Sequence, residues 1–277
     1  MRLEWTRRLP APARRVMLAR ERWLLLVQDP HALCLWDAWG EPGIAWTRSR
    51  LHLVHLSETA QLILATDNNN RLVVLSAELE LLWQRVWDRP LHAVAVAPLG
   101  QYLAVADEGG VTVLTEQGEP IWRRATPRAL HHLAWVPETL ALVGAADLGF
   151  VCCFDRAGTL LWQEGLPSHL GGVSVSGNGQ ETLLACFSDG IRRRSTERPG
   201  TTILNGSSPC RSLIASYSAD VLITLALSGR SVERFERSSG SKQTVQREAA
   251  ITAVASDAFG QSVVLATSAG ELSLWLA

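Results

Sequence analysis

The 277-residue sequence lacks long apolar runs. It has no stretch of 18 or more apolar residues free of charge, and its first ten residues contain no apolar segment long enough for the core of a signal peptide. We therefore predict neither a membrane-spanning helix nor export. The five cysteines are odd in number and show no CxxC spacing. We expect them to be reduced side chains that fill a core, which fits a cytoplasmic protein.

Lysine is almost absent: Lys242 is the single lysine among the 26 lysine and arginine residues. This composition favours a bacterial source. The formal net charge is −1, so no overall field would draw the chain to nucleic acid or to an anionic membrane. Hydrophobic residues make up 47% of the chain and charged residues 19%, which argues against disorder and favours sheets buried on both faces.

Sequence motifs of catalysis are missing as well. The chain contains no GxSxG nucleophile motif, no GxxxxGK[ST] phosphate loop and no GxGxxG fingerprint that follows a strand. We therefore predict that the protein is not an enzyme and needs no cofactor.

Tryptophan recurs with the spacing of a structural repeat. The intervals from Trp5 to Trp46, Trp83, Trp122 and Trp162 are 41, 37, 39 and 40 residues. A second register, with intervals of 39 to 41, runs through Trp36, Leu75, Leu114, Phe154, Ser195, Phe235 and Trp275. Seven repeats of about 40 residues, each built from short strand-like runs, are typical of a β-propeller with four antiparallel strands per blade.

The third repeat shows the unit most clearly. Residues 93–97, 102–106, 111–114 and 120–123 are four short runs of β-forming residues, which we name strands a to d. Glycine and proline separate them, as expected of tight turns. An aspartate marks the turn between strands b and c in five repeats, at Asp29, Asp67, Asp107, Asp147 and Asp189.

The two ends of the chain complete each other. The seventh repeat, residues 249–277, stops after strand c, and residues 2–7 resemble the strand d of other repeats. Pairing them would close the ring and protect its exposed sheet edges. We therefore predict an all-β fold, a seven-bladed β-propeller of four-stranded antiparallel blades, in which residues 1–277 form a single domain and the N-terminal strand completes the last blade.

These repeats resemble two known families. The run from Asp155 through Gly158 to Trp162 fits the Asp-x-x-Gly-x-x-x-Trp hairpin of quinoprotein (PQQ-like) blades, whereas the repeat length, the turn aspartates and Trp36-Asp37 are similar to WD40 proteins. Both resemblances imply propeller geometry. The chain departs from WD40 proteins in having no Gly-His dipeptide at the start of a repeat, so their hydrogen-bonded tetrad is not expected. A PQQ cofactor would require a periplasmic address and ring-binding residues, which the sequence does not show.

Histidine offers one candidate metal site. His52, His92 and His131 occupy equivalent positions just before strand a in three successive repeats. Three imidazoles on one rim of a channel could hold zinc. The alternative, which we favour, is that each histidine caps a turn, so we predict no metal site.

The strongest local charge lies in repeats 5 and 6. Residues 190–247 carry a net charge of +6, whereas the rest of the chain carries −7. The run Arg192 to Arg194 falls where other repeats place apolar residues of strand c, and buried charge is costly unless it is paired. Either this strand is frayed and solvated, or its arginines meet an acidic partner. The candidate partner-binding residues are Arg192, Arg193, Arg194, Arg234 and Arg237.

These observations favour a protein-binding scaffold or adaptor subunit of a cytoplasmic, bacterial multi-protein assembly. Nucleic acid is not the expected partner, because the basic segment is not interleaved with aromatic residues that could stack on bases. A membrane partner is not expected either. Two alternatives remain open: a lactonase-like or other hydrolytic propeller with its site in the central funnel, and a separately encoded sensory domain of a signalling or defence system.

Overall fold

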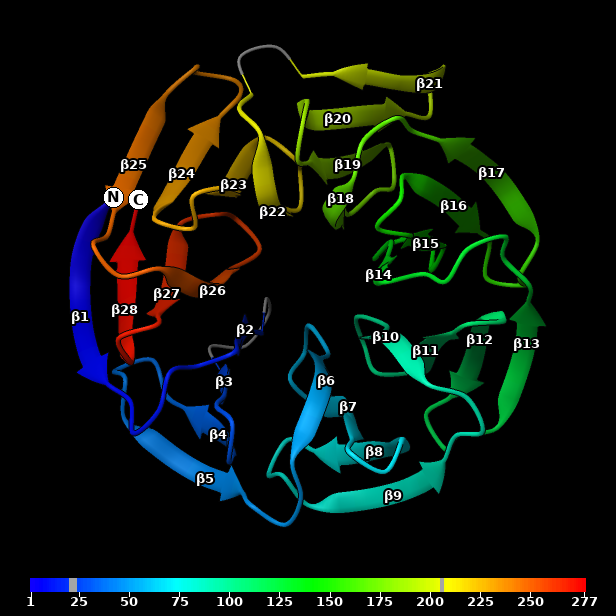
Figure 1. Ribbon diagram of the computed structural model, residues 1–277, viewed down its shortest axis with the longest axis horizontal. Helices are drawn as coiled ribbons and strands as arrows, with labels where there is room; N and C mark the ends of the chain where they lie inside the picture. Colours follow the sequence, from blue (N-terminus) through cyan, green and yellow to red (C-terminus); the bar gives the residue numbers. More distant parts are fainter. Residues whose placement is uncertain (20–23, 205–206) are drawn as a thin grey trace.

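The chain forms a closed ring of seven sheets around a central channel (Figure 1). The computed structural model describes residues 1–19, 24–204 and 207–277. Within these residues, 28 strands make seven four-stranded sheets, and every strand pairing is antiparallel. The predicted seven-bladed β-propeller is therefore confirmed. No helix suited to span a membrane occurs in the described part of the chain.

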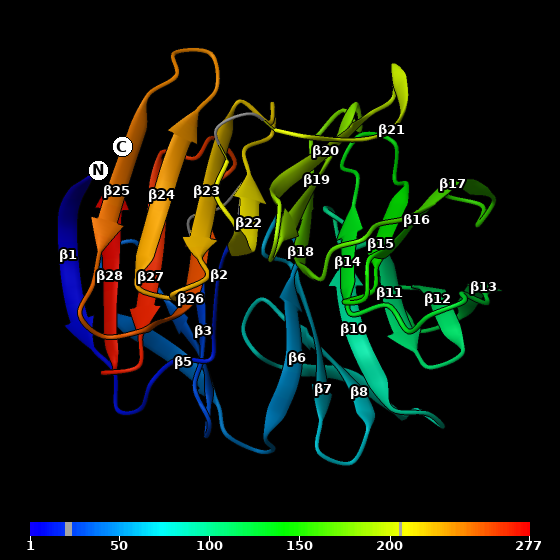
Figure 2. The same ribbon diagram turned by 45° about the horizontal axis from the view of Figure 1, so that its top comes forward.

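Each blade takes its four strands from consecutive sequence, except the last. Strand a of each blade lines the channel and strand d lies at the circumference, as the tilted view also shows (Figure 2). Blade 1 comprises β2 (Arg15–Leu18), β3 (Leu25–Gln28), β4 (Leu33–Trp36) and β5 (Pro42–Trp46); blade 2 comprises β6 (Leu51–Leu56), β7 (Leu62–Asp67), β8 (Arg71–Ser76) and β9 (Leu81–Val86); blade 3 comprises β10 (Leu91–Val96), β11 (Tyr102–Asp107), β12 (Gly110–Thr115) and β13 (Pro120–Arg124); blade 4 comprises β14 (His132–Trp135), β15 (Leu142–Ala145), β16 (Phe150–Phe154) and β17 (Leu160–Gly165).

The remaining blades follow the same order until the ring closes. Blade 5 comprises β18 (Leu170–Val175), β19 (Glu181–Cys186), β20 (Gly190–Ser195) and β21 (Arg198–Ile203); blade 6 comprises β22 (Cys210–Ala215), β23 (Val221–Ala226), β24 (Ser231–Glu236) and β25 (Lys242–Gln246); blade 7 comprises β26 (Ile251–Ser256), β27 (Ser262–Thr267), β28 (Glu271–Leu276) and β1 (Arg2–Arg8).

Closure of the ring occurs where the sequence predicted it. Strand β1 pairs antiparallel with β28, so that Leu3 lies opposite Trp275 and Trp5 lies opposite Leu274. The two ends of the chain consequently lie next to each other in Figure 1. The terminal strand thus covers the edge of β28 that would otherwise remain unpaired.

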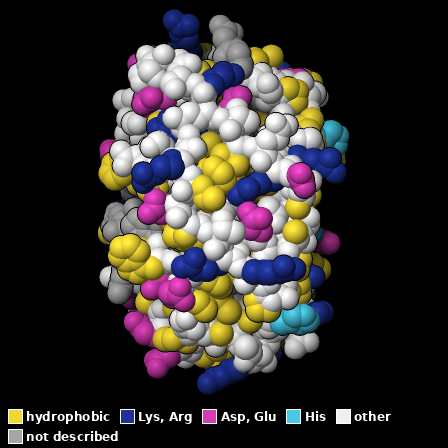
Figure 3. Space-filling view, turned by 90° about the vertical axis from the view of Figure 1, so that its left-hand side faces the viewer, with side chains coloured by type: hydrophobic (Ala, Val, Ile, Leu, Met, Phe, Trp, Pro, Cys, Tyr) yellow, Lys and Arg dark blue, Asp and Glu magenta, His cyan; other side chains and the backbone are white. Residues whose placement is uncertain are grey.

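Burial decreases from the middle of each blade outward. Every residue of β7 and of β27 is buried, and the hydrophobic clusters join neighbouring blades face to face. The outer strand β9 is almost fully exposed. On the circumference near β1, basic, acidic and apolar side chains are interspersed (Figure 3). Stacked sheets that are buried on both faces explain the high apolar content.

The cysteines belong to this core. Cys152, Cys153, Cys186 and Cys210 are buried, Cys34 is half-buried, and all five are free thiols. Burial raises the pKa of Cys152, Cys153 and Cys210 to about 12. These thiols therefore pack as small apolar side chains.

A repeated pair of hydrogen bonds connects three of the blade interfaces. In each, a strand d tryptophan donates its indole N–H, and an arginine two residues later donates its guanidinium N–H, to carbonyls of the c–d turn in the next blade. We call this pair the Trp–Arg tie. The pairs are Trp5 with Ala38 and Arg7 with Gly40 between blades 7 and 1, Trp83 with Glu116 and Arg85 with Gly118 between blades 2 and 3, and Trp122 with Arg156 and Arg124 with Gly158 between blades 3 and 4.

Neither hydrogen bond of the tie is present between blades 1 and 2 among the described residues. Leu79 stands where the other turns have glycine, and its side chain packs in one cluster with Trp46. The indole nitrogen of Trp46 is buried and has no partner among the described residues. At the interfaces around blades 5 and 6, arginines replace the tie, and they include the candidate site residues.

Candidate functional site

Strand β20, which carries Arg192 to Arg194, is not frayed. It pairs with β19 on one side and with β21 on the other, with Arg193 opposite both Leu183 and Thr202. Since successive side chains of a strand point to opposite faces, Arg193 faces away from its two arginine neighbours. All three guanidinium groups form ion pairs with carboxylates of the same chain. The charges of this strand are therefore balanced within the protein, which differs from both expectations from the sequence, a solvated strand or an acidic partner.

Arg192 and Arg194 form the contacts on one face of this strand. Arg192 donates two hydrogen bonds to Asp189 at 2.8 and 2.6 Å within its own blade. Arg194 reaches Glu164 of blade 4 at 3.3 Å, and its guanidinium carbon lies 4.4 Å from the centroid of the Trp162 ring. Arg194 therefore covers the one strand d tryptophan of blade 4 in place of the Trp–Arg tie.

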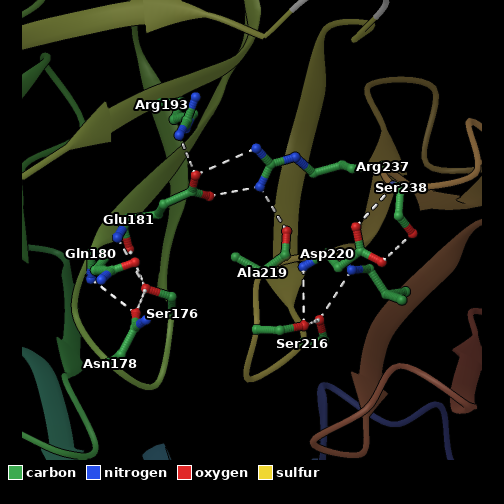
Figure 4. Close-up of polar contacts among 12 residues, drawn as sticks. Ser176, Asn178, Gln180, Glu181, Arg193, Ser216, Ala219, Asp220, Arg237 and Ser238 are labelled. Atoms are coloured by element: carbon green, nitrogen blue, oxygen red, sulfur yellow. Dashed lines mark hydrogen bonds and ion pairs between the residues drawn. The ribbon is translucent and has the colours of Figure 1, made fainter. Parts of the chain in front are cut away.

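Arg193 and Arg237 meet on the other face, at the carboxylate of Glu181 (Figure 4). Arg193 of blade 5 approaches one carboxylate oxygen to 2.5 Å, and Arg237 of blade 6 approaches the other to 2.6 Å. Arg237 also donates to the carbonyl of Ala219 at 2.8 Å. We call these three charged residues the Glu181 bridge; it joins two blades that lack a Trp–Arg tie.

Arg234 does not belong to this surface. Only 7% of it is exposed, and its Nε donates to the carbonyl of Gly260 in blade 7 at 2.8 Å. The structure therefore brings Arg193 and Arg237 together, directs Arg192 and Arg194 to the opposite face of the blade, and encloses Arg234 between blades 6 and 7. Binding of a partner by any of the five stays a prediction.

A groove opens beside the Glu181 bridge. Its cavity of about 310 Å³ is lined by Arg193, Thr202, Ile203, Leu204, Phe235 and Arg237. Its walls are therefore the outer strand of blade 5 and strand β24 of blade 6. Ile203 is 52% exposed, and Lys242 lies 5.2 Å from the centroid of the Phe235 ring.

The bridge leaves the groove short of negative charge. One carboxylate serves two guanidinium groups, and the Nε–H of Arg193 is buried without a partner among the described residues. A buried donor without an acceptor costs free energy, and a surplus guanidinium retains hydrogen-bonding capacity for a further carboxylate. The groove is thus chemically suited to an acidic ligand with apolar neighbours.

Sequence reasoning missed the acidic half of these contacts. The net charge of +6 belongs to residues 190–247, whereas Glu164, Glu181 and Asp189 all precede that range. Asp189 could have been found, because it precedes Arg192 by three residues in the same hairpin. Glu164 reaches Arg194 only through the packing of blade 4 against blade 5.

Only two of the three candidate histidines, His92 and His131, are in contact with each other. The rings of His92 and His131 meet edge to face at a centroid distance of 5.0 Å, whereas His52 hydrogen-bonds to Asn68. His131 and His132 both contact Asp147, at 3.7 and 3.1 Å. Within the described residues, no group of three His, Cys, Asp or Glu side chains is placed to hold a metal ion.

The central channel contains a largely apolar cavity of about 280 Å³, lined by strand a of all seven blades. His55 lies in its wall, and its Nδ1 accepts the backbone N–H of Val96 at 3.1 Å. Burial, followed by the charge of Arg15, lowers the pKa of His55 to about 4. His55 is therefore a neutral imidazole with its proton on Nε2.

Comparison with known proteins assigns this chain to no family: no family model matches it, and no curated protein matches it.

Proposed function

We propose that the protein is a non-enzymatic interaction platform that binds an acidic segment of a partner protein in the groove between blades 5 and 6. The observation that carries this proposal is the Glu181 bridge, where Arg193 and Arg237 share one carboxylate. Both guanidinium groups keep some solvent exposure, so a glutamate or aspartate of a partner could accept hydrogen bonds from their accessible N–H groups and balance the surplus charge.

The shape of the groove supports a peptide segment as the ligand. Ile203, Leu204 and Phe235 give it apolar walls next to the cations, so a partner side chain beside the acidic residue can be buried. A rigid ring with a site on its circumference suits a subunit or adaptor of a larger assembly. The resemblance to WD40 and PQQ-like repeats, the cytoplasmic location and the bacterial source remain parts of this proposal.

The cleanest test adds a negative charge to the groove and leaves the Glu181 bridge intact. We expect Ile203→Glu to weaken binding of an acidic partner by at least about tenfold, because the new carboxylate repels the ligand and competes for the arginines. The matched control is Ile44→Glu, since Ile44 lies on the outer strand of blade 1 and is 53% exposed. Both variants should fold with unchanged thermal stability.

The measurement has two stages. Partners are first identified by affinity purification from the native cell and quantitative mass spectrometry, and each purified partner is then titrated into wild type, Ile203→Glu and Ile44→Glu. Support requires a partner whose affinity falls with salt and with Ile203→Glu, and is retained by Ile44→Glu. Equal affinity for all three proteins would overturn the proposal.

The hydrolase alternative would use the central channel instead. Turnover of ester or lactone substrates that is lost in His55→Gln and retained in Ile203→Glu would favour that function over the platform. A sensory domain would show binding of a small signal molecule that changes its affinity for a partner. The platform and the hydrolase are therefore distinguished by variants in two distant parts of the ring.

A further inference from the structure

A second cavity lies at the end of the channel where the inner strands begin. It has a volume of about 360 Å³ and spans the first residues of strand a in blades 6, 7 and 1. Its polar lining comprises Arg14, Arg15, Arg211, Ser212 and Thr252. Val16, Met17, Leu225 and Val254 supply its apolar lining. We call it the channel-mouth cavity.

The three arginines of this cavity are not neutralised within the described chain. Arg14 and Arg211 are exposed, and among the described residues their side chains form no hydrogen bond or ion pair. The Nη1 of Arg15 donates to the carbonyl of Val54 at 3.3 Å, which leaves its charge uncompensated. This contrasts with Arg192, Arg193, Arg194 and Arg237, which all meet carboxylates.

Carboxylates at the b–c turns of blades 1, 2 and 3 have hydrogen-bonding partners of their own. Asp67 is paired with Arg71 at 2.6 Å, and Asp107 is paired with Arg123 at 2.8 Å. Asp29 accepts two backbone N–H groups of its own turn at 2.7 Å. Within the described residues, no aspartate or glutamate is among the residues that line the channel-mouth cavity.

The surroundings of Arg15 strengthen the local positive field. Arg15 is exposed at the mouth, as Arg14 and Arg211 are, and desolvation of its guanidinium group lowers its pKa from the ordinary value. The field also acts on His55, which is neutral and adds no charge. The three guanidinium groups carry like charges and line one cavity, so they repel one another, and an anion would relieve that repulsion.

From these observations we propose that the channel-mouth cavity binds a small organic phosphate, with the phosphate on Arg14, Arg15 and Arg211 and the organic portion on the apolar wall. Three guanidinium groups carry +3, which exceeds what one carboxylate can balance and suits a phosphate dianion or a diphosphate. The hydroxyl groups of Ser212 and Thr252 add hydrogen-bonding capacity for further phosphate oxygens. The volume falls within the range of small-ligand pockets and exceeds that of a bare phosphate ion.

Calorimetric titration of the full chain at low salt tests this site. The probes are AMP and inorganic diphosphate, with adenosine as the neutral comparison. We expect AMP and diphosphate to bind and adenosine to bind at least about tenfold more weakly, because it lacks the charge that the arginines recognise. The double variant Arg14→Gln/Arg211→Gln should weaken both anions by about tenfold or more.

Two further variants control the experiment. Arg230→Gln removes an exposed arginine at the b–c turn of blade 6, outside the cavity, and should bind AMP like wild type. Ser212→Asp places a carboxylate among the arginines and should abolish binding while it leaves the thermal stability unchanged or raised. Because Arg14 and Arg211 form no side-chain bonds in the described structure, the double variant should also fold normally.

The outcomes separate cleanly. Binding of AMP that depends on Arg14 and Arg211 and not on Arg230 supports the proposal. Wild-type protein that binds neither AMP nor diphosphate, or a double variant that binds them as tightly as wild type, overturns it. Binding of diphosphate without AMP overturns the assignment of the organic portion. None of these results affects the partner titration with Ile203→Glu. A failure to bind phosphate ligands would therefore not contradict the proposed interaction platform.

Discussion

At the scale of single residues, the DxxG…W pattern of the repeats has a structural cause that spans two blades. Asp155 accepts the backbone N–H groups of Ala157 and Thr159 at 2.9 and 2.7 Å and so holds the turn. Gly158 adopts a φ of +82° and lies directly against the ring of Trp122 from the preceding blade. The turn aspartate, the glycine and the tryptophan therefore form one contact between neighbouring repeats.

Replacing Gly158 tests that contact. A Cβ at residue 158 would lie 2.7 Å from the Trp122 ring, so Gly158→Ala combines an unfavourable φ with a steric clash. We expect a loss of about 2–4 kcal/mol in the free energy of unfolding, measured by chemical denaturation. Gly200→Ala is the matched control, because Gly200 has the same φ of +82° and open space around its Cβ position.

The control should lose only about 1 kcal/mol, which is the cost of the left-handed backbone itself. An equal loss in the two variants would show that the Trp122 contact contributes nothing beyond the turn conformation.

At the scale of elements, strand β20 shows how a charged sequence occupies the inside of a blade. Its backbone is fully paired, and ion pairs on both faces offset the desolvation of Arg192, Arg193 and Arg194. Removing a carboxylate from such a pair costs more than the pair itself contributes, because an unpaired charge stays behind. The arginines of blades 5 and 6 thus take over connections that the Trp–Arg tie provides elsewhere.

Strand β6 gives a prediction for pH. The pKa of His55 is lowered to about 4 in the folded protein, by burial and then by Arg15, from an ordinary value of 6.5. Between pH 6.5 and 4, His55 is protonated in the unfolded chain and neutral in the folded protein. The free energy of unfolding therefore decreases as the pH falls from 6.5 to 4. Since His55 is half-buried, we expect a loss of about 1–3 kcal/mol over that interval.

Denaturation at several pH values checks this prediction. His55→Gln should show a shallower decrease between pH 6.5 and 4 than wild type, whereas His52→Gln, at an exposed position of the same strand, should follow wild type. Parallel curves for wild type and His55→Gln would contradict the assigned protonation state.

At the scale of the whole molecule, stability depends on closure of the ring. Strand β1 pairs with β28 over its length, and Trp5 also donates to the carbonyl of Ala38 in blade 1 at 3.0 Å. The same seven residues therefore complete one blade and connect it to the next. Without them, an apolar face and a sheet edge would be exposed.

Deletion of residues 1–8 should lower the melting temperature by about 10 °C or more, since several kcal/mol of burial and pairing are lost. Differential scanning calorimetry measures the effect. The double variant Arg2→Ala/Glu4→Ala, which alters exposed side chains and keeps the strand, should melt within about 2 °C of wild type. Equal melting temperatures for the deletion variant and wild type would refute the role of β1 in closure.

Much of the architecture was predictable because it follows from a repeated local sequence pattern. Turn residues and β-forming runs repeat every 40 residues or so, and the seventh repeat lacks a strand that the first residues resemble. The positions of His92 and His131 were also foreseeable, since equivalent residues of neighbouring blades lie side by side. The meeting of Arg193 and Arg237 was not foreseeable, since it depends on the position of Glu181 and on the packing of blade 5 against blade 6.

The amino-acid sequence alone predicts the number of blades, the order of their strands and the way the ring closes, because these depend on short-range patterns and on hydrogen bonds between successive segments. The positions of the positive charges depend on how the blades pack against one another. Glu164 pairs with Arg194 and Glu181 pairs with Arg237 across blade interfaces, whereas Arg14, Arg15 and Arg211 line a cavity at the channel mouth that, within the described residues, has no carboxylate in its lining. Electrostatic energy depends on distance in space and on burial, and neither quantity follows from separation along the chain.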